Sequence, residues 1–355
     1  MSQFEDFNAE NKLRIPLSWY AAQTIDSDCM NFSIKKTTLI NTIIINFADT
    51  ADCSISIRLE EYRKELSNHF RKSELKKHEE AIQTILIGKA NALTDKYAKR
   101  YPSDVNWQII LNKKVKGLLT EDPSTNEETY YGPKPGHYVR ALIEEYARLP
   151  YYQREEIIFK DILQKINDAI NNHYSIKLIN IKGIRLSMKP YKIETDPLSM
   201  YHYIVGYIVT PPDYTTDSTS LTEKSKVQSI RISRLTDVEI QHYQSAIITE
   251  LEERQILFEM EQKGVQFVSG DSSHIKVWLS DNGIKKYNSQ IHLRPIGEVD
   301  KNDFHIYYFE CTEAQALYYF FSFGRDAKIL SPSSLVDKFI NTYNNALEAY
   351  KTSGQ

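Results

Sequence analysis

The sequence predicts a mixed α+β protein built from several domains. The chain has 355 residues, which is more than one ordinary hydrophobic core requires. Helical periodicity dominates its first half, and short segments rich in β-branched residues and tyrosine then follow one another without a helix between them. These patterns predict an N-terminal strand–helix–helix module, a helical connector, a small antiparallel barrel and an α+β extension, at residues 1–50, 51–150, 151–244 and 245–355.

The N-terminal module is predicted to begin with a strand. In the segment KLRIPL, Lys12 and Arg14 alternate with apolar residues, which is the period-two pattern of a strand with one solvated face. Ser18 is a suitable N-cap for a first helix, and Ser33 is one for a second helix. The second helix should bury an apolar stripe formed by Leu39, Ile40, Ile43 and Phe47.

The connector combines charged and amphipathic helical patterns. Residues 56–100 hold apolar residues at helical spacing and more Lys and Arg than Asp and Glu, so we expect a helix with a locally basic surface. A loop rich in turn residues follows at 121–138. Two amphipathic helices, at 138–149 and 154–173, then lead into the barrel.

Four successive strand patterns predict the barrel. They lie at residues 175–181, 183–193, 201–210 and 227–235. Short strands with no helix between them are typical of a small antiparallel barrel. The polar segment from Pro211 to Lys226 has no apolar period, and we expect it to be a surface loop.

The extension is predicted to contain both strands and helices. Strand patterns lie at residues 274–280, 289–296 and 304–311. An apolar helix over 313–323 should end at Gly324, because glycine favours the left-handed conformation that ends helices. The last helix should start with Ser331 as its N-cap and Pro332 as its first residue.

The composition excludes several classes of protein. A net charge of -3 means that any nucleic-acid site must be a local basic patch. Three scattered cysteines provide neither a disulfide framework nor a zinc site. The polar N-terminus is unlike a signal peptide, and no apolar run is long enough to span a bilayer. We therefore expect a cytoplasmic protein that requires no metal and no cofactor.

The predicted barrel contains the motifs of a known domain. Its segments include INDAINNHYSIKL, the Lys189-Pro190 turn with YKI, the tripeptide His202-Tyr203-Ile204 and the strand RISRL. These motifs resemble the WYL domain, an Sm-like five-stranded barrel, although the tripeptide departs from the family at its first and third residues. The tail FSFGRDAKILSPSSLVDKFINTYNNALEAY is similar to the C-terminal extension that follows WYL domains, for which we expect a part in dimerisation.

A second resemblance concerns the N-terminal module. Residues 12–50 resemble a ribbon–helix–helix, whose strand pairs with a second copy to make a dimer. A ribbon–helix–helix joined to a WYL domain and its extension is similar to the WYL accessory proteins of type VI-D CRISPR systems. The resemblance implies single-stranded RNA as the ligand, a homodimer, and a role in antiviral defence. It also implies an RNA-guided ribonuclease as the partner whose activity the protein enhances.

Strand alternation indicates which barrel residues meet this RNA. In residues 184–189, Ile184, Leu186 and Met188 should face the core, which turns Arg185 and Lys189 to the opposite face. The same rule turns Arg231 outward. Cations neutralise phosphates, and aromatic rings stack on unpaired bases. The expected RNA-binding residues are Arg185, Lys189, Tyr191, His202, Tyr203, Arg231 and Arg234.

The N-terminal module provides a secondary set of candidates for nucleic-acid binding. Lys12 and Arg14 on the strand are placed to reach base edges in a DNA groove. Free amides at the start of the second helix, together with Lys35 and Lys36, form a candidate phosphate site. Dimerisation alone is the alternative role of this module.

We expect a nucleic-acid-binding protein and not an enzyme. One alternative is a transcriptional regulator that binds operator DNA and a nucleotide-like effector. The other is a standalone ribonuclease, because Arg71 and His78 have the spacing of a class of metal-independent ribonucleases, in which histidine transfers the proton and arginine stabilises the phosphorane. The Lys-rich segment produces this spacing readily by chance.

Overall fold

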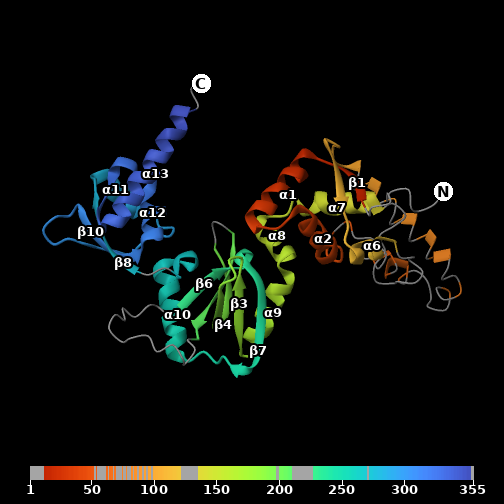
Figure 1. The fold of residues 1–355 in the computed structure, drawn as a ribbon, viewed down its shortest axis with the longest axis horizontal. Coiled ribbons are helices and arrows are strands. Elements are labelled where there is room, and N and C mark those ends of the chain that lie inside the picture. Colours follow the sequence, from red (N-terminus) through yellow and green to blue (C-terminus); the bar gives the residue numbers. More distant parts are fainter. Residues whose placement is uncertain are drawn as a thin grey trace. The chain divides into compact units, whose positions relative to one another are not determined.

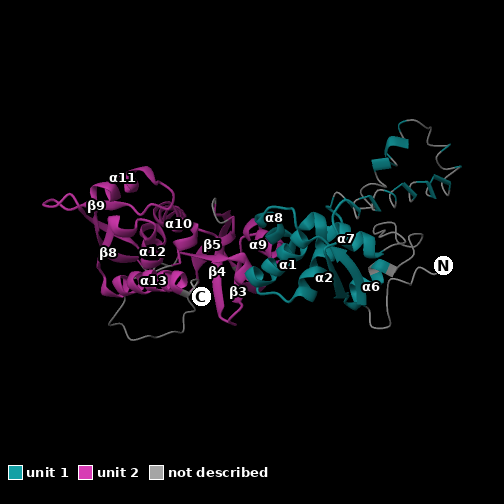
Figure 2. Ribbon diagram, turned by 90° about the horizontal axis from the view of Figure 1, so that it is seen from above, with its two compact units in different colours: residues 1–161 teal, residues 162–355 magenta. Residues whose placement is uncertain are grey.

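A computed structural model describes most of the chain. The described residues are 12–51, 53, 100–120, 135–196, 200–209, 227–269 and 272–352, together with isolated positions between 61 and 99. They form two compact units, Met1–Asp161 and Ile162–Gln355 (Figure 2). Arg71 and His78, the candidate ribonuclease pair, lie outside the described residues, as do residues 121–134 and 211–226 of the two predicted loops.

Unit 1 is mainly helical with a two-stranded sheet (Figure 1). Its elements are β1 (Lys12–Leu17), α1 (Trp19–Phe32), α2 (Lys36–Phe47), β2 (Val105–Ile110), α6 (Lys113–Thr120), α7 (Pro135–Tyr146) and α8 (Tyr151–Ile158). The predicted strand and first two helices are therefore present. The predicted helix over 154–173 is instead two helices, α8 and α9 (Lys160–Asn171), separated at Phe159, whose ring packs edge-on against Phe32.

The partner of β1 lies in the same chain. All six residues of β1 pair antiparallel with β2, from Lys12 opposite Ile110 to Leu17 opposite Val105. We expected a second copy of the chain to supply the strand that pairs with β1. This expectation is wrong for the edge of β1 that pairs with β2. The physical reason is that β2 provides a complementary strand, with Ile109 buried on the same side as Leu13.

The caps of the first two helices differ from each other. Ser18 caps α1 as predicted, because its side chain accepts a hydrogen bond from the amide of Ala21. Ser33 does not cap α2: it ends α1 in a left-handed conformation with φ 56°, and Lys35 occupies the N-cap of α2 without a side-chain hydrogen bond. The predicted apolar stripe of α2 is buried.

Unit 2 contains a five-stranded antiparallel sheet. Its strands are β3 (Tyr174–Asn180), β4 (Arg185–Thr195), β5 (His202–Ile208), β6 (Val227–Arg231) and β7 (Leu235–Ser245), in the order β6-β5-β4-β3-β7. The fourth predicted strand stops at Arg231, where a short 3-10 helix (Ile232–Arg234) turns the chain into β7. The sequence did not reveal β7 as a separate strand.

This sheet is not a closed barrel among the residues that the structure describes. β7 pairs with β3, and no pairing joins β7 to β6. The outer edge of β6 is bonded to a side chain instead: the amide of Ser229 donates to the hydroxyl of Ser269 over 2.8 Å, and that hydroxyl donates back to the carbonyl of Ser229. The backbone groups of Ser229 that barrel closure would use are thus already satisfied.

A second sheet of four strands follows in the order β11-β8-β10-β9. The elements of this region are α10 (Glu250–Lys263), β8 (Ser272–Leu279), α11 (Asp281–Ser289), β9 (Gly297–Val299), β10 (Ile306–Thr312), α12 (Glu313–Phe321), β11 (Ala327–Ser331) and α13 (Ser333–Thr352). The strand predicted at 289–296 is wrong. The sequence there ends α11 and turns, with Leu293 at φ 51°, a conformation outside the strand region.

The core of this second sheet is aromatic. Tyr287, Phe309, Tyr319 and Phe320 are buried together, with ring centroids 5.0–6.2 Å apart in several tilted and edge-on pairs. This burial explains why the predicted apolar helix, α12, is present. In the described part of the chain, no helix has the length and apolar character needed to cross a bilayer.

Candidate nucleic-acid interface

A hollow of about 530 Å³ lies on the first sheet of unit 2. Residues of β3 to β6, the 3-10 helix after β6 and the segment after α10 line it. The lining includes three of the predicted RNA-binding residues, Tyr203, Arg231 and Arg234, and one aromatic residue that the sequence analysis did not select, Tyr201. Two guanidinium groups and two phenol rings therefore share one concave surface.

Arg231 and the two tyrosines form the centre of this hollow. Arg231 lies opposite Tyr203 in the pairing of β6 with β5, which places both side chains on the same face of the sheet. The guanidinium carbon of Arg231 is 3.2 Å from the ring centroid of Tyr201, a cation–π contact. This contact places the guanidinium over the face of an aromatic ring.

The charges of both arginines act on the phenol of Tyr203. Burial raises the pKa of the Tyr203 phenol, and the positive charges of Arg231 and Arg234 partly oppose that rise. The phenol is consequently neutral at physiological pH. The charged side chains that act on this phenol are Arg231, Arg234 and Asp196, and the carboxylate of Asp196 adds to the rise of its pKa.

The wall of the hollow is held by two serines. Besides its backbone bonds to Ser269, Ser229 donates its hydroxyl to the carbonyl of Val265 over 2.5 Å. These bonds fasten the segment after α10 to β6. As a result, the side chains of Gln266 and Ser269 complete the lining beside Arg231.

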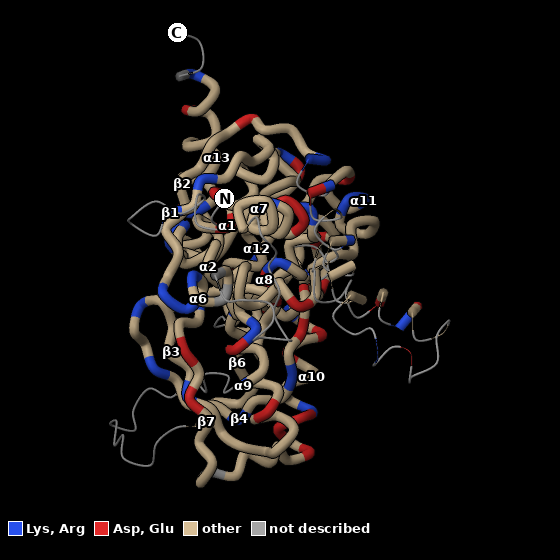
Figure 3. The backbone as a smooth tube through the Cα atoms, turned by 90° about the vertical axis from the view of Figure 1, so that its right-hand side faces the viewer, with Lys and Arg blue, Asp and Glu red and all other residues tan. Residues whose placement is uncertain are grey.

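Two of the other predicted RNA-binding residues are bonded to side chains of helix α10. Lys189 donates to both carboxylate oxygens of Glu252, over 2.8 and 3.2 Å, and the hydroxyl of Tyr191 donates to Glu253 over 2.8 Å. Burial opposes ionisation of Glu252, but hydrogen bonds from Lys189 and Thr249 outweigh it, so the pKa of Glu252 is lowered. Acidic positions recur along α10 (Figure 3), and this face is unsuited to phosphates.

The last two predicted residues of this set lie elsewhere. His202 is 6% exposed, and strand alternation turns it away from Tyr203, so it does not share the surface that we predicted. Arg185 is exposed at the start of β4 but does not line the hollow. The alternation at that end also differs from the prediction, because Ile184 is 59% exposed instead of facing the core.

The N-terminal candidates are divided between exposed and paired positions. Arg14 is exposed and Lys12 is half-buried on the face of β1 opposite the buried Leu13, as predicted. Lys35 is exposed at the start of α2. Lys36, however, pairs with Asp26 over 2.5 Å and lies 4.0 Å from the ring centroid of Trp107, so its charge is already compensated within unit 1.

One sequence signal would have revealed α10. Thr249 and Glu252 form a capping box: the Thr249 side chain accepts from the Glu252 amide, and the Glu252 side chain accepts from the Thr249 amide. The Thr-x-x-Glu spacing is visible in the sequence. Recognising it would have identified the helix whose Glu252 pairs with Lys189.

Comparison with solved structures supports the architecture. The chain is similar to a CRISPR Cas-related protein of known crystal structure, with a TM-score of 0.64 and 24% sequence identity, over 97% of this chain and 95% of that one. At this level of identity the similarity establishes the mixed α+β fold alone. Proteasome accessory factor B/C (PafBC) of Arthrobacter aurescens matches with a TM-score of 0.30 and 12% identity, over 66% of this chain and 36% of that one, which is too low to support an argument.

The comparisons by sequence identify no family. No protein-family model matches the chain, and no curated protein matches it either.

Proposed function

We propose that the chain is a CRISPR-associated accessory protein that binds single-stranded RNA in the hollow of unit 2 and modulates an RNA-guided ribonuclease. The observation that carries the proposal is the gathering of Tyr201, Tyr203, Arg231 and Arg234 in one concavity. Cations there attract phosphates, and rings accept unpaired bases, which is the combination that single strands require. In this proposal the protein binds and regulates but does not itself cleave RNA.

Two further lines of support come from resemblance to CRISPR-associated proteins, one in sequence and one in fold. The sequence resembles a WYL domain with its C-terminal extension, as in the accessory proteins of type VI-D CRISPR systems. The fold resembles a CRISPR Cas-related protein over nearly the whole chain. We retain a homodimer as part of the proposal, although the in-chain pairing of β1 with β2 removes one reason for it.

The binding test measures the anisotropy of a labelled single-stranded RNA at several salt concentrations. Arg231→Ala and Arg234→Ala should each weaken binding and lower the salt slope by about 0.7, because each removes one phosphate contact. Arg254→Ala is the matched control, since Arg254 is an exposed arginine of the same unit that lies outside the hollow. Affinities of the folded hollow variants equal to that of the native chain would contradict the proposal.

The regulatory test uses an RNA-guided ribonuclease of a type VI-D CRISPR system. The native chain should raise the rate at which this enzyme cleaves its target RNA, and the two hollow variants should raise it less. A duplex RNA that binds as tightly as the single strand would contradict the choice of ligand. Target cleavage unchanged by the native chain would contradict the accessory role.

A transcriptional regulator is the second candidate. The volume of the hollow, about 530 Å³, lies in the range of small-molecule sites, so a nucleotide-like effector would fit it. In that case Arg14 on the exposed face of β1 is a candidate DNA contact. A palindromic DNA footprint that depends on Arg14, with no preference for single-stranded RNA, would favour this candidate.

A further inference from the structure

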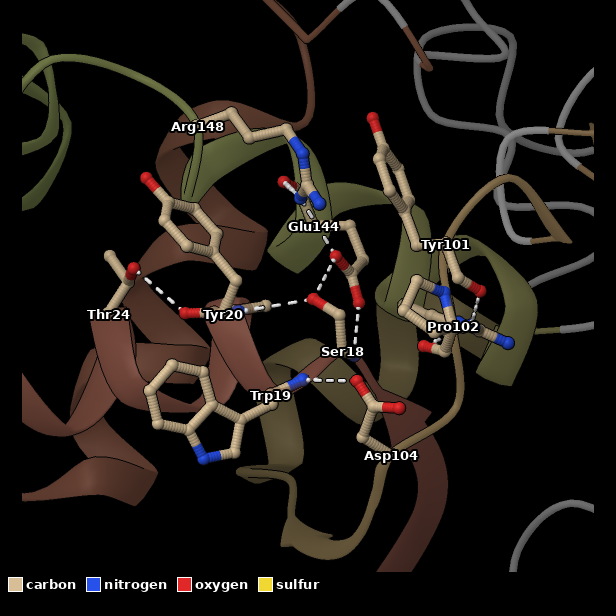
Figure 4. A network of polar contacts seen from close by, with 11 residues as sticks. Ser18, Trp19, Tyr20, Thr24, Tyr101, Pro102, Asp104, Glu144 and Arg148 are labelled. Carbon is tan, nitrogen blue, oxygen red and sulfur yellow. Dashed lines mark hydrogen bonds and ion pairs between the residues drawn. The ribbon is translucent and has the colours of Figure 1, made fainter.

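A row of alternating arginine and tyrosine side chains lies near the start of α1 in unit 1. The guanidinium carbon of Arg148 is 3.7 Å from the ring centroid of Tyr101 and 5.4 Å from that of Tyr20. Arg100 adds a further cation–π contact, 5.7 Å from the Tyr101 ring. We call Arg100, Tyr101, Arg148 and Tyr20 the ladder. Figure 4 shows the Arg148 guanidinium between the two rings, with the indole of Trp19 on the Tyr20 side.

Buried hydrogen bonds hold the ladder in place. Glu144 is fully buried and accepts from the amide and hydroxyl of Ser18, over 2.6 and 2.8 Å, and from Arg148 over 2.8 Å. Arg140 donates to the carbonyl of Tyr101 over 2.6 Å. The backbone that carries Tyr20, Tyr101 and Arg148 is thus anchored before any ligand arrives, which lowers the entropic cost of binding.

The aromatic side chains at the end of the ladder are open to solvent. Trp19 is 61% exposed and Tyr20 is 52% exposed, although both follow the buried Ser18 directly. The amide of Trp19 donates to Asp104 over 2.9 Å, which fixes the first turn of α1. These two adjacent rings present apolar faces that a planar ligand can cover, and covering them removes apolar surface from water.

We infer that Trp19 and the ladder form a base-stacking site for single-stranded RNA, separate from the hollow of unit 2. Every nucleobase has a flat face that extends a stack of rings and guanidinium planes. The exposed charge of Arg100 attracts the phosphates between such bases, whereas the charge of Arg148 is already paired with Glu144. This inference rests on the proposed function, because it takes the same class of RNA as the ligand.

The surroundings favour RNA over a protein partner. Protein hot spots use the same residue types, Trp, Tyr and Arg, but they lie at the centre of a larger, well-packed surface that excludes water. Among the described residues of unit 1, the only other large apolar side chains with high exposure are Met30, Ile85 and Ile110. Of these, Met30 lies at the opposite end of α1 from the rings, 11 positions along the chain from Trp19. Flat rings flanked by arginine, without an aliphatic neighbour on their own turn, suit a planar ligand better.

Trp19 provides a direct optical test. The chain has three tryptophans, so the emission of Trp19 is obtained as the difference between the native protein and Trp19→Phe. Titration with oligouridylate and oligoadenylate should decrease this difference signal in a saturable way, because stacking on a base quenches indole emission. Fluorescence anisotropy of the same labelled RNA measures total binding in parallel.

Substitutions along the ladder should weaken the RNA binding that quenching of Trp19 reports. Tyr20→Ala should raise the concentration of RNA needed for half-maximal quenching roughly 5- to 150-fold, which corresponds to about 1–3 kcal/mol. Arg100→Ala, which leaves the Glu144 network intact, should lower the salt slope of quenching by about 0.7. Met30→Ala is the matched control, an exposed residue of the same helix that should leave the titration unchanged.

The outcomes separate this inference from the proposed function. RNA that binds by anisotropy without quenching Trp19 would overturn the stacking site and leave the hollow intact. Quenching that persists in Arg231→Ala would support a separate site. Quenching that is unchanged in Tyr20→Ala would overturn the inference. A Tyr20→Ala variant that still binds RNA normally but no longer affects the ribonuclease would also overturn it, in favour of a protein contact. An absence of any RNA binding would overturn both.

Discussion

Asp28 is a fully buried carboxylate in the middle of α1, and its replacement gives a strong test of the packing in unit 1. It accepts hydrogen bonds from the hydroxyl of Tyr146 over 2.9 Å and from the guanidinium of Arg154 over 2.8 and 3.0 Å. Burial lowers the pKa of Arg154, but its bond to Asp28 outweighs this effect and raises it. The three groups therefore form a closed, charge-compensated cluster.

Asp28→Asn should reduce the free energy of unfolding of unit 1 by about 3–5 kcal/mol. This range is the cost of leaving one member of a buried ion pair without its counter-charge. Tyr146→Phe removes a single hydrogen bond to a charged acceptor and should cost about 1.5–3 kcal/mol. Because both changes alter the same Tyr146–Asp28 hydrogen bond, the double variant should cost less than the sum, by roughly 0.5–3 kcal/mol.

Urea unfolding followed by tryptophan emission measures these values. In a Trp278→Phe background, the remaining tryptophans, Trp19 and Trp107, both lie in unit 1, so the signal reports that unit alone. Asp26→Asn is the matched control: the side chain of this α1 residue is 45% exposed and pairs with Lys36, so its replacement should cost less than about 1 kcal/mol. A loss below about 1 kcal/mol in Asp28→Asn, or strict additivity in the double variant, would refute the reasoning.

Two further predictions concern unit 2. Gly206→Ala should destabilise the first sheet by about 1–3 kcal/mol in a urea titration, because the Cβ of the new alanine would collide with the carbonyl of Lys189. Gly117→Ala is the control and should not destabilise the protein, because a Cβ at this position meets nothing within 4 Å. Burial raises the pKa of the Cys311 thiol from 9.0 to about 12, so unfolding releases its proton above pH 9. The stability advantage of the native chain over Cys311→Ala should therefore be full below pH 9 and decrease as the pH rises toward 12; an advantage independent of pH in this range would contradict the assignment.

Local patterns predicted much of the fold but only part of the candidate site. The alternation in β1 and the N-cap at Ser18 were predictable, because a strand face and a cap depend on residues within a few positions. The cap at Ser33 was wrong, since its left-handed backbone ends the preceding helix. Tyr203, Arg231 and Arg234 were selected by sequence and do line one hollow, because neighbouring antiparallel strands bring their faces together.

The sequence by itself determined the elements that a strong local pattern marks, such as β1, α2 and α12, and which cations leave the core. Only the tertiary structure decided which of those cations remain available to a ligand. Lys189 satisfies the alternation rule, yet Glu252, 63 positions later, neutralises it. The hydroxyl of Ser269 likewise occupies the edge of β6 that a closed barrel would require. Such contacts join residues far apart in the chain, and the periodicity of a single strand or helix carries no information about the element that packs against it.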